Sequence, residues 1–339
     1  MMPKLLKSIM INFNTPEARF AIHAVRQASL LVKLVQSKMV SPALTKGDRS
    51  PVTVADFASQ ALISKLLAES FPDDPLVGEE DARCLQTAGE NQTLDQVTGF
   101  VGNFTTQATP ERVCAWIERG GAEPAQRFWT LDPIDGTKGF LRGDQYVVAL
   151  ALIIDGQVQV GVLGCPDLRD GYLVDRSGPG SLVIAVRGSG TWVTALEGEE
   201  KYIGLHVSSQ ADVVQARILR SFESGHTNIS QVDLFVQALG VQAAPVRMDS
   251  QAKYAVQAAG AGELYLRLLS SSQPNYREKI WDQAAGSLLI EEAGGRVTDL
   301  DGKPLDFTAG RELVHNRGIL ASNGPLHAGA LQALRAIQA

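Results

Sequence analysis

Two long apolar runs, residues 146–154 and 157–165, are separated only by Asp155 and Gly156. An Asp-Gly pair between two strand-length runs is typical of a tight hairpin, because both turn residues tolerate a positive φ. The middle of the chain is therefore predicted to be an antiparallel sheet. Other strand-like runs in this part of the chain cover residues 128–132, 182–186 and 191–193.

Two amphipathic helices are predicted ahead of this sheet. Thr15 and Pro16 have the pattern of a helix start, with a hydroxyl side chain at the cap and proline at the first helical position. Apolar residues then recur at helical spacing as far as about Lys38, and a second helix is predicted over residues 55–70. A short apolar strand over residues 76–80 follows it.

The pattern changes after residue 216, where strand-like and helix-like stretches alternate. This alternation is typical of a parallel sheet with helices packed against it. A final helix, strand and helix are expected at the end of the chain. The alternating stretches are strands at residues 218–222, 246–249 and 263–268 and helices at residues 230–239 and 251–258.

Together these patterns predict an α/β fold, specifically an α+β layered sandwich. In it, the N-terminal helices and the antiparallel sheet are fused to a smaller C-terminal α/β unit. A chain of 339 residues is long enough for two domains, and we place them at residues 1–207 and 208–339. The functional site is expected at their junction, where pockets often form. Residues 81–126 read as an insertion, with a helix expected within residues 110–120.

Composition narrows the class of protein. The net charge of −6 argues against a general nucleic-acid surface. Cys84, Cys114 and Cys165 stand far apart, which argues against a disulfide framework or a zinc site. No apolar run approaches the length of a membrane span, and the first residues lack the core and cleavage site of a signal peptide. A cytoplasmic protein is predicted, with a weak organelle signal at the N-terminus left open.

The stretch LDPIDGT, residues 131–137, carries the clearest chemistry. It holds Asp132 and Asp135 three residues apart with a stiff proline between them, followed by Gly136 and Thr137. Magnesium prefers hard oxygen ligands and keeps room for water and substrate phosphate, so the stretch favours a metal-dependent phosphatase. Alone, however, the same residues could form a tight turn with a side-chain hydrogen bond, because Asp, Pro and Gly are all turn formers.

Three further acids stand at comparable places. Asp56 lies at the start of the second predicted helix, Glu79 ends a strand, and Asp282 is expected to open a helix. Singly, an acid at a helix start is more often a cap than a ligand, and a strand-end acid is usually solvated. As a set, acids at strand ends and helix starts favour a site at the mouth of an α/β unit.

These motifs resemble a known family. VGEE (77–80), LDPIDGT (131–137) and WDQAAG (281–286) occur in the order seen in the inositol monophosphatase superfamily of lithium-sensitive, magnesium-dependent phosphatases. The resemblance covers about residues 15–324 and is weak between residues 83 and 126. Within the superfamily the chain looks most like the 3′(2′),5′-bisphosphate nucleotidases. That likeness rests on SPVTVADFASQALI (50–63), KGFLRG (138–143), MDSQAKY (248–254) and YLRL (265–268).

The resemblance implies a metal-assisted hydrolysis with two to three magnesium ions and inhibition by lithium. In the family's pattern Asp56 orients the Thr137 hydroxyl, which positions the attacking water, and no covalent intermediate is needed. The amides around Gly136 and Thr137 are expected to bind phosphate if a helix begins there. The implied metal ligands are the side chains of Glu79, Asp132, Asp135 and Asp282 and the backbone carbonyl of Ile134.

The implied substrate is 3′-phosphoadenosine 5′-phosphate, hydrolysed to AMP and phosphate, with its sulfated precursor as a further substrate. Ser250, Lys253 and Arg267 match positions that contact the nucleotide and its 5′-phosphate, and His226 matches less securely a contact to the base. Without the resemblance, Lys253 could equally be solvated and Arg267 a surface residue. The expected partner is this small nucleotide, with no nucleic acid and no membrane, and the expected state is a monomer.

Two alternatives stay open at this point. The first is an inositol polyphosphate 1-phosphatase or inositol monophosphatase with the same metal residues; KGFLRG and MDSQAKY favour the nucleotide instead. The second is a non-catalytic sensor that binds the nucleotide and signals through a partner. The joint presence of Asp56 and Thr137 argues against a sensor, because binding alone does not require that pair.

Overall fold

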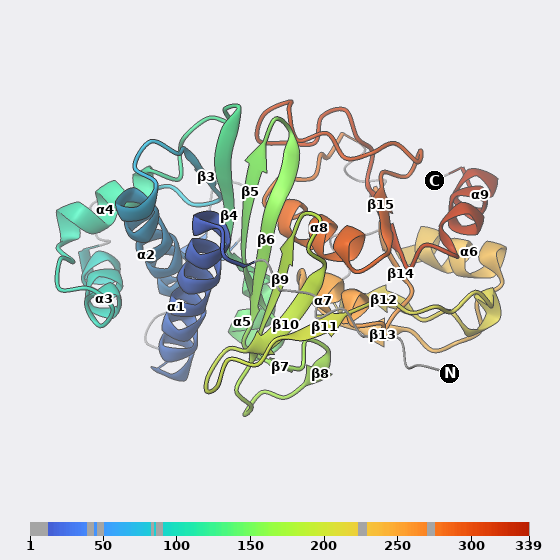
Figure 1. Ribbon diagram of the computed structural model, residues 1–339, viewed down its shortest axis with the longest axis horizontal. Helices are drawn as coiled ribbons and strands as arrows, with labels where there is room; N and C mark the ends of the chain where they lie inside the picture. The colour runs from blue at the N-terminus through green and yellow to red at the C-terminus, as the bar shows by residue number, and fades with distance from the viewer. Residues whose placement is uncertain are drawn as a thin grey trace, which may run out of the picture.

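Helices and sheets alternate in five layers. In Figure 1 the order is helix, sheet, helix, sheet and helix, with the two sheets on either side of a central helical layer. This arrangement confirms the predicted layered α+β sandwich. The computed structural model describes residues 13–38, 44–45, 51–82, 85, 91–222, 229–269 and 275–338.

The first sheet is the predicted antiparallel one. Asp155 and Gly156 have φ of 51° and 72°, and Ile154 pairs with Gln157 across them, which confirms the tight hairpin. Only β3 and β4 run parallel, and the other neighbouring strands of this sheet are antiparallel. Its seven strands are, in spatial order, β11 (Ile203–Leu205), β10 (Thr191–Ala195), β9 (Ser181–Val186), β6 (Gln157–Cys165), β5 (Val147–Ile154), β4 (Arg127–Asp135) and β3 (Leu76–Gly78).

Strand β4 extends further than the sequence predicts. It was expected to end at residue 132, before a turn, but its pairing with β5 continues to Asp135. The register shifts between Asp132 and Asp135, so the strand bulges there. The bulge contains Pro133, which has no N–H for the ladder and is tolerated in sheets mainly at edges and bulges. The central motif is therefore a bulged strand end rather than a free turn.

Helices α1 (Pro16–Lys38) and α2 (Val54–Ser70) cover the outer face of the first sheet, as predicted. Two helices from the segment 81–126, α3 (Asn91–Gly102) and α4 (Pro110–Glu118), pack against α2. Helix α4 confirms the helix expected within residues 110–120. Helix α3 was not predicted from the sequence.

The second sheet is mixed rather than parallel. β13, β12 and β14 are parallel, whereas β16 runs antiparallel to both β14 and β15. β15 and β16 are consecutive strands with no helix between them, so they need no crossover and can pair antiparallel. The chain thus ends in a helix, two strands and a helix, one strand more than predicted. In spatial order the strands are β13 (Val246–Arg247), β12 (Ile218–Arg220), β14 (Leu264–Arg267), β16 (Ile319–Ser322) and β15 (Arg296–Thr298).

The helices of the second half lie on both faces of this sheet. α7 and α8 pack between the two sheets, whereas α6 and α9 pack together on the outer face (Figure 1). Their bounds are α6 (Ile229–Leu239), α7 (Ala252–Ala258), α8 (Ala284–Glu292) and α9 (His327–Ala336). The remaining short elements are α5 (Thr137–Arg142), β1 (Leu44–Thr45), β2 (Pro51–Val52), β7 (Leu168–Arg169), β8 (Leu173–Val174) and the 3₁₀ turn Val213–Gln215.

Two glycines of β6 let helices approach the first sheet closely from both sides. A Cβ at Gly161 would lie 2.9 Å from the carbonyl oxygen of Ala285 on α8, and a Cβ at Gly164 would collide with Ser29 on α1. Because α8 lies so close to the first sheet and also contacts β15 of the second, one helix joins the two halves. The division at residues 207 and 208 falls between β11 and β12 and stays a prediction.

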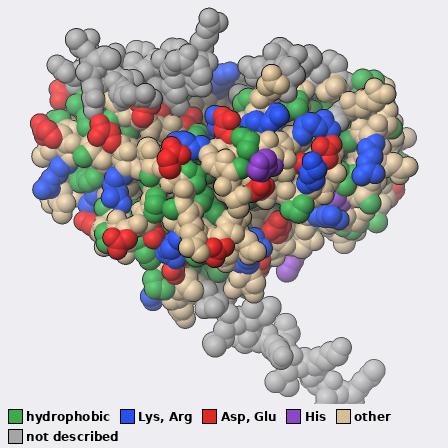
Figure 2. Space-filling model, turned by 90° about the horizontal axis from the view of Figure 1, so that it is seen from above, with side chains coloured by type: hydrophobic (Ala, Val, Ile, Leu, Met, Phe, Trp, Pro, Cys, Tyr) green, Lys and Arg blue, Asp and Glu red, His purple; other side chains and the backbone are tan. Residues whose placement is uncertain are grey.

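The cysteines and the charged surface residues bear on the predictions made from composition. Cys114 and Cys165 are free thiols, and Cys84 lies outside the described residues. Acidic and basic side chains are intermingled on the face that Figure 2 shows. No helix in the described ranges is long and apolar enough to cross a membrane.

A buried histidine makes the fold sensitive to acid. His327 at the start of α9 is 1% exposed, with Nδ1 2.8 Å from Ser322 Oγ and Nε2 3.1 Å from Thr298 Oγ1. Burial, assisted by the charge of Arg296, lowers the pKa of His327 from 6.5 to about 4. Unfolded chains therefore bind a proton at a higher pH than folded ones, so stability is lost as the pH falls from about 6.5 towards 4.

We expect the His327 contribution to lower the free energy of unfolding by about 2 kcal/mol between pH 7.5 and pH 5. Urea denaturation of the wild type and of His327→Asn at both pH values measures it. The variant is less stable at pH 7.5 but loses less stability on acidification. Equal losses in the two proteins would contradict the assignment.

Candidate active site

The LDPIDGT motif lies where β4 ends and α5 begins. Asp132 is buried, and its Oδ1 accepts a hydrogen bond of 3.1 Å from the backbone N–H of Ile134. This is the local side-chain hydrogen bond of the turn alternative, and it is present. It fixes the backbone between the two aspartates, so it orients the Ile134 carbonyl rather than excluding a metal-binding role.

Asp56 and Thr137 meet, as the family pattern implies. Asp56 is fully buried near the start of α2, where its Oδ2 accepts hydrogen bonds from the backbone N–H and the hydroxyl of Thr53, at 2.8 and 2.6 Å. Its Oδ1 lies 3.4 Å from Thr137 Oγ1, which is also 3.2 Å from the carbonyl oxygen of Ile134. Asp56 is thus a helix cap on one oxygen and a partner of Thr137 on the other.

Glu79 is positioned through a residue that sequence reasoning missed. Its backbone N–H donates to the carbonyl of Leu131, 3.2 Å away. Gln60 on α2 holds the next residue, with Nε2 2.6 Å from the carbonyl oxygen of Glu80 and Oε1 3.0 Å from its N–H. A Cβ at Gly78 would lie 2.6 Å from Gln60 Oε1, so glycine makes room for this bridge. The only signal in the sequence was a glutamine within FASQALI (57–63), among mostly apolar residues, and its burial is visible only in the structure.

Asp282 lies in the turn before α8 rather than in the helix itself, which begins at Ala284. Gln251 supports this turn, because its Nε2 donates to the carbonyl oxygen of Trp281 at 3.1 Å. The backbone N–H of Gln251 donates to Asp135 Oδ2 at 2.7 Å. One residue of MDSQAKY therefore contacts both acid-bearing segments, a role that the motif alone did not reveal.

Asp135, Asp282 and Glu79 come from three segments and lie close enough for their charges to interact. Burial raises the pKa of Asp282 well above 3.8, and the nearby charges of Asp135 and Glu79 raise it further. Burial also raises the pKa of Asp135, against the opposing effects of Lys253 and the Gln251 amide. Carboxylates that are removed from water and repel one another need a counter-charge.

That donor set fits divalent metal ions. It consists of oxygen ligands, and it lacks the thiolate and imidazole ligands that favour zinc. In the part of the chain that the structure describes, no three His, Cys, Asp or Glu side chains are already grouped so that they could hold one ion. The acids adjoin one another without forming a closed cage, and two of them are destabilised as anions. A divalent cation bound among them would supply the missing charge.

Two predicted substrate residues adjoin the acids. Lys253 on α7 is 2% exposed, so the solvated alternative is wrong, and its Nζ donates to Ser221 Oγ at 3.0 Å. Burial lowers the pKa of Lys253 from 10.5 to about 8, and the charge of Asp135 opposes this effect. Arg267 is not a surface residue either, because its side chain is 15% exposed and forms a two-pronged ion pair with Glu278. The structure thus places a positive region beside the acids.

Gly136 and Ser250 pack against each other. Gly136 has φ of 90°, and a Cβ there would lie 2.9 Å from the Cβ of Ser250. α5 begins at the next residue, Thr137, as the prediction required. Glycine is thus needed for its backbone conformation and for the approach of the Ser250 turn, as well as for the expected phosphate. His226 lies outside the described residues.

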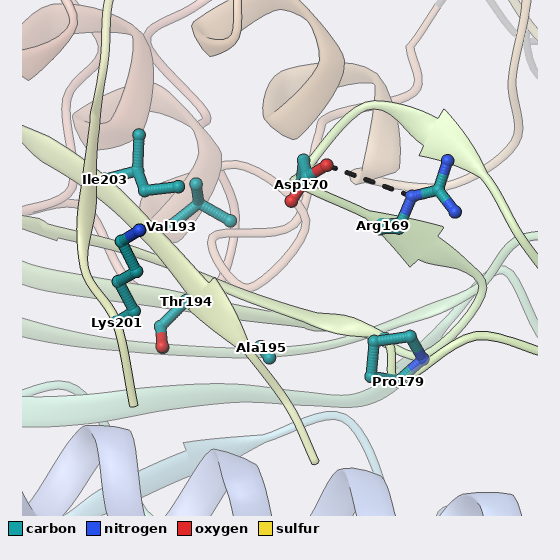
Figure 3. Close-up of a pocket in the computed structure, with 9 residues that line it drawn as sticks. Arg169, Asp170, Pro179, Val193, Thr194, Ala195, Lys201 and Ile203 are labelled. Atoms are coloured by element: carbon teal, nitrogen blue, oxygen red, sulfur yellow. Dashed lines mark ion pairs between the residues drawn. The ribbon is translucent and has the colours of Figure 1, made fainter. Parts of the chain in front are cut away.

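A small pocket elsewhere is unrelated to these residues. It lies between the β7–β8 hairpin and β10, with Arg169 and Asp170 on one side and Lys201 and Ile203 on the other (Figure 3). None of the predicted metal, catalytic or substrate residues lines it. The candidate site is instead assigned to the acids at the ends of β3 and β4 and in the turn before α8.

Comparison with known proteins identifies the family. Residues 14–339 match the inositol monophosphatase family. The chain belongs to that family. Members with solved structures share its fold: an IMPase of Thermotoga maritima aligns with a TM-score of 0.66 at 21% identity, covering 96% of this chain and 98% of its own. An inositol monophosphatase from Anabaena aligns with a TM-score of 0.61 at 21% identity, covering 94% of each chain.

Curated relatives within the inositol monophosphatase family are more similar in sequence. A 3′(2′),5′-bisphosphate nucleotidase of Schizosaccharomyces pombe is 39% identical over 95% of both chains. A 3′(2′),5′-bisphosphate nucleotidase of Oryza sativa is 40% identical over 94% of this chain and 93% of its own. The resemblance stated from the motifs therefore extends over nearly the whole chain.

Proposed function

We propose that this protein is a magnesium-dependent phosphatase that hydrolyses the 3′-phosphate of 3′-phosphoadenosine 5′-phosphate, releasing AMP and phosphate. Its sulfated precursor, 3′-phosphoadenosine 5′-phosphosulfate, is a second proposed substrate. The observation that carries the proposal is the position of Lys253, a buried cation in the electric field of Asp135, which precedes Thr137, the partner of Asp56, by two residues. A substrate with two phosphates needs this combination of an acidic centre and a second positive region. The names of the similar curated proteins support the same substrate.

The proposed metal ligands are those predicted from the sequence. They are the side chains of Glu79, Asp132, Asp135 and Asp282 and the carbonyl oxygen of Ile134. Two to three magnesium ions held there would activate a water molecule and stabilise the leaving ribose oxygen, and lithium would inhibit by competing for these sites. Burial, together with repulsion between the carboxylates, raises the pKa values of Asp135 and Asp282. These shifts support the assignment, because a bound cation would favour the charged form of both groups.

The proposed catalytic pair is Asp56 and Thr137. A hydroxyl has one hydrogen to donate, and Thr137 can give it either to Asp56 Oδ1 or to the Ile134 carbonyl. Once it donates to Asp56, its oxygen is free to accept a hydrogen bond from the attacking water and hold it in line with the phosphorus. The water oxygen forms the new bond to phosphorus, the bond from phosphorus to the 3′-oxygen breaks, and one proton of the water is passed on to the ribose oxygen, so that AMP and hydrogen phosphate are released.

The 5′-phosphate is proposed to bind to Ser250, Lys253 and Arg267. In the present arrangement Ser250 Oγ donates to the carbonyl of Asp249, and Lys253 and Arg267 are held by Ser221 and Glu278. These contacts pre-form a polar region from α7 and β14. A 5′-phosphate bound there would replace the neutral Ser221 hydroxyl as the partner of Lys253. At the other end of the substrate, the amides of Gly136 and Thr137 would donate to the 3′-phosphate. His226 is proposed as a base contact.

A substrate panel tests the proposal. With magnesium, we expect the purified protein to release phosphate from 3′-phosphoadenosine 5′-phosphate faster than from inositol 1,4-bisphosphate or inositol 1-phosphate, and to stop on addition of EDTA or lithium. Faster release from either inositol phosphate would assign the protein to the inositol phosphatases instead. Nucleotide binding without any phosphate release would favour a sensor.

The other predicted properties remain proposals. We propose a monomer that acts on a small nucleotide in the cytoplasm, with no nucleic-acid or membrane partner. The negative net charge supports the absence of a nucleic-acid partner. Sedimentation analysis of the full chain tests the oligomeric state.

A further inference from the structure

Two motifs that lie far apart in the sequence meet beside the candidate site. Arg142, the last residue of α5 in KGFLRG, donates from Nη2 to Asp249 Oδ2 in MDSQAKY, 2.6 Å away and 107 residues later. The Asp249 side chain is 6% exposed and that of Arg142 is 37% exposed. This ion pair ties a helix at the end of the first sheet to a turn that follows β13 of the second sheet.

Both partners of this pair are held from outside it. The other oxygen of Asp249, Oδ1, accepts a hydrogen bond of 3.0 Å from the backbone N–H of Phe222, at the end of β12. Arg142 Nε also donates to Asp144 Oδ2 at 3.3 Å, and Asp144 is in turn paired with Arg176. Arg142 therefore lies between two carboxylates, which fixes the direction of its guanidinium group.

The turn that Asp249 begins has a strained backbone. Ser250 has φ of 60°, a left-handed conformation that residues with a side chain adopt rarely and only when their surroundings impose it. Its hydroxyl donates to the carbonyl of Asp249 at 2.6 Å and accepts from the N–H of Ala252 at 3.2 Å. On the other side it packs on Gly136, where a Cβ would leave no room.

The same turn carries the contacts to the rest of the site. The N–H of Gln251 donates to Asp135 Oδ2 at 2.7 Å, and Lys253 Nζ lies 3.4 Å from the carbonyl oxygen of Met248. A shift of Asp249 would move Ser250 and change where Lys253 and the Gln251 amide point. A chain of contacts therefore connects Arg142, through Asp249, to the residues that would bind the second phosphate.

We propose that Arg142 and Asp249 form a positioning pair that fixes the Ser250 turn and thereby sets the preference for a nucleotide with a second phosphate. This inference rests on the proposed function. It gives KGFLRG a physical role in substrate choice, through MDSQAKY rather than through direct contact with the reacting phosphate. Arg142 and Asp249 act on the substrate only through Ser250 and Lys253.

The test compares two substrates that differ by one phosphate, 3′-phosphoadenosine 5′-phosphate and adenosine 3′-phosphate. For Arg142→Gln and for Asp249→Asn, we expect the ratio of kcat/KM between them to fall about tenfold, mainly through a higher KM for the bisphosphate. The double variant should lose no more than the worse single variant, because both changes break the same contact. Arg142→Lys, which keeps the charge but not the fork, should recover part of the ratio.

The matched control is another Arg–Asp pair in the second half of the chain. Arg317 Nη2 lies 2.8 Å from Asp301 Oδ1 with both side chains exposed, and Arg317→Gln combined with Asp301→Asn should leave the ratio unchanged. Thermal unfolding of each variant checks that it is folded at the assay temperature.

The outcomes separate the two proposals. Wild-type protein that hydrolyses neither nucleotide would overturn the proposed function, and this inference with it. An active wild type whose Arg142 and Asp249 variants keep the wild-type ratio would overturn this inference alone. Equal losses on both substrates, in step with a lower unfolding temperature, would also overturn it, since they would show a purely structural pair.

Discussion

Replacement of Asp56 by asparagine is expected to lower kcat for the bisphosphate by about 1,000-fold while leaving nucleotide binding intact. Asparagine has the same shape, and its one carbonyl oxygen can still accept from the backbone N–H and hydroxyl of Thr53. Its NH₂ group then faces Thr137 Oγ1, where Asp56 presents an acceptor. In the variant, the Thr137 hydroxyl can no longer donate its hydrogen to residue 56. Its oxygen is then no longer kept free to accept a hydrogen bond from the attacking water.

Single-turnover kinetics and equilibrium nucleotide binding measure the two parts of this prediction separately. Asp212→Asn is the control, because Asp212 is also a cap, accepting from the N–H of Val214 at 3.0 Å, but lies on the surface. We expect that variant to keep wild-type activity. Loss of binding and turnover together in Asp56→Asn, or retained turnover, would refute the role assigned to Asp56.

The second large effect is expected at Asp282, where stability and activity should change in opposite directions. Without magnesium, Asp282→Asn should raise the melting temperature at pH 8 by about 2 °C or more. Burial and the charges of Asp135 and Glu79 raise the pKa of Asp282 above its unfolded value. At low pH Asp282 is protonated and does not destabilise the fold. This stability is lost as the pH rises through the pKa that Asp282 has in the folded protein, and a neutral amide at this position avoids the loss.

With magnesium the order should reverse. Ions that bind only the folded state stabilise it by about 2.7 kcal/mol at a concentration 100 times the dissociation constant. The wild type should gain this stability on binding magnesium, whereas Asp282→Asn should gain little. The activity of Asp282→Asn should be more than about 100-fold lower than that of the wild type. Calorimetry with EDTA and with magnesium measures both effects.

Asp233→Asn, an exposed change on α6, is the control and should behave as the wild type. A variant that is destabilised without metal would contradict the electrostatic account. A variant with a full response to magnesium would contradict the role of Asp282 as a ligand.

Much of the fold could be predicted because it depends on local rules. The Asp155-Gly156 hairpin, the helix start at Thr15-Pro16 and the positions of β5, β6, β9 and β10 follow from turn chemistry, capping and side-chain periodicity. For the second sheet, prediction was right for β12, β13 and β14, which are parallel, and wrong for its last two strands. Alternating strands and helices suggested a parallel sheet, but β15 and β16 pair antiparallel because no helix separates them.

The candidate site shows the same division. Motif spacing identified the acids of LDPIDGT and their partners, and Asp56 does meet Thr137. It did not identify Gln60, Gln251 or Glu278, since a glutamine or glutamate has no distinctive pattern until its distant partners are known. These residues position Glu80, Asp135 and Arg267, respectively.

The sequence by itself determined the chemical inventory: oxygen ligands on both sides of a stiff proline, a carboxylate and a hydroxyl for water, and a family that uses them together. These are properties of residue type and short spacing, which the chain carries before it folds. Only the tertiary structure decided that Lys253 is buried in the electric field of Asp135 and that Arg142 reaches Asp249 across 107 residues. Burial and long-range charge depend on which segments pack together, and α8 sets that packing by lying close to both sheets.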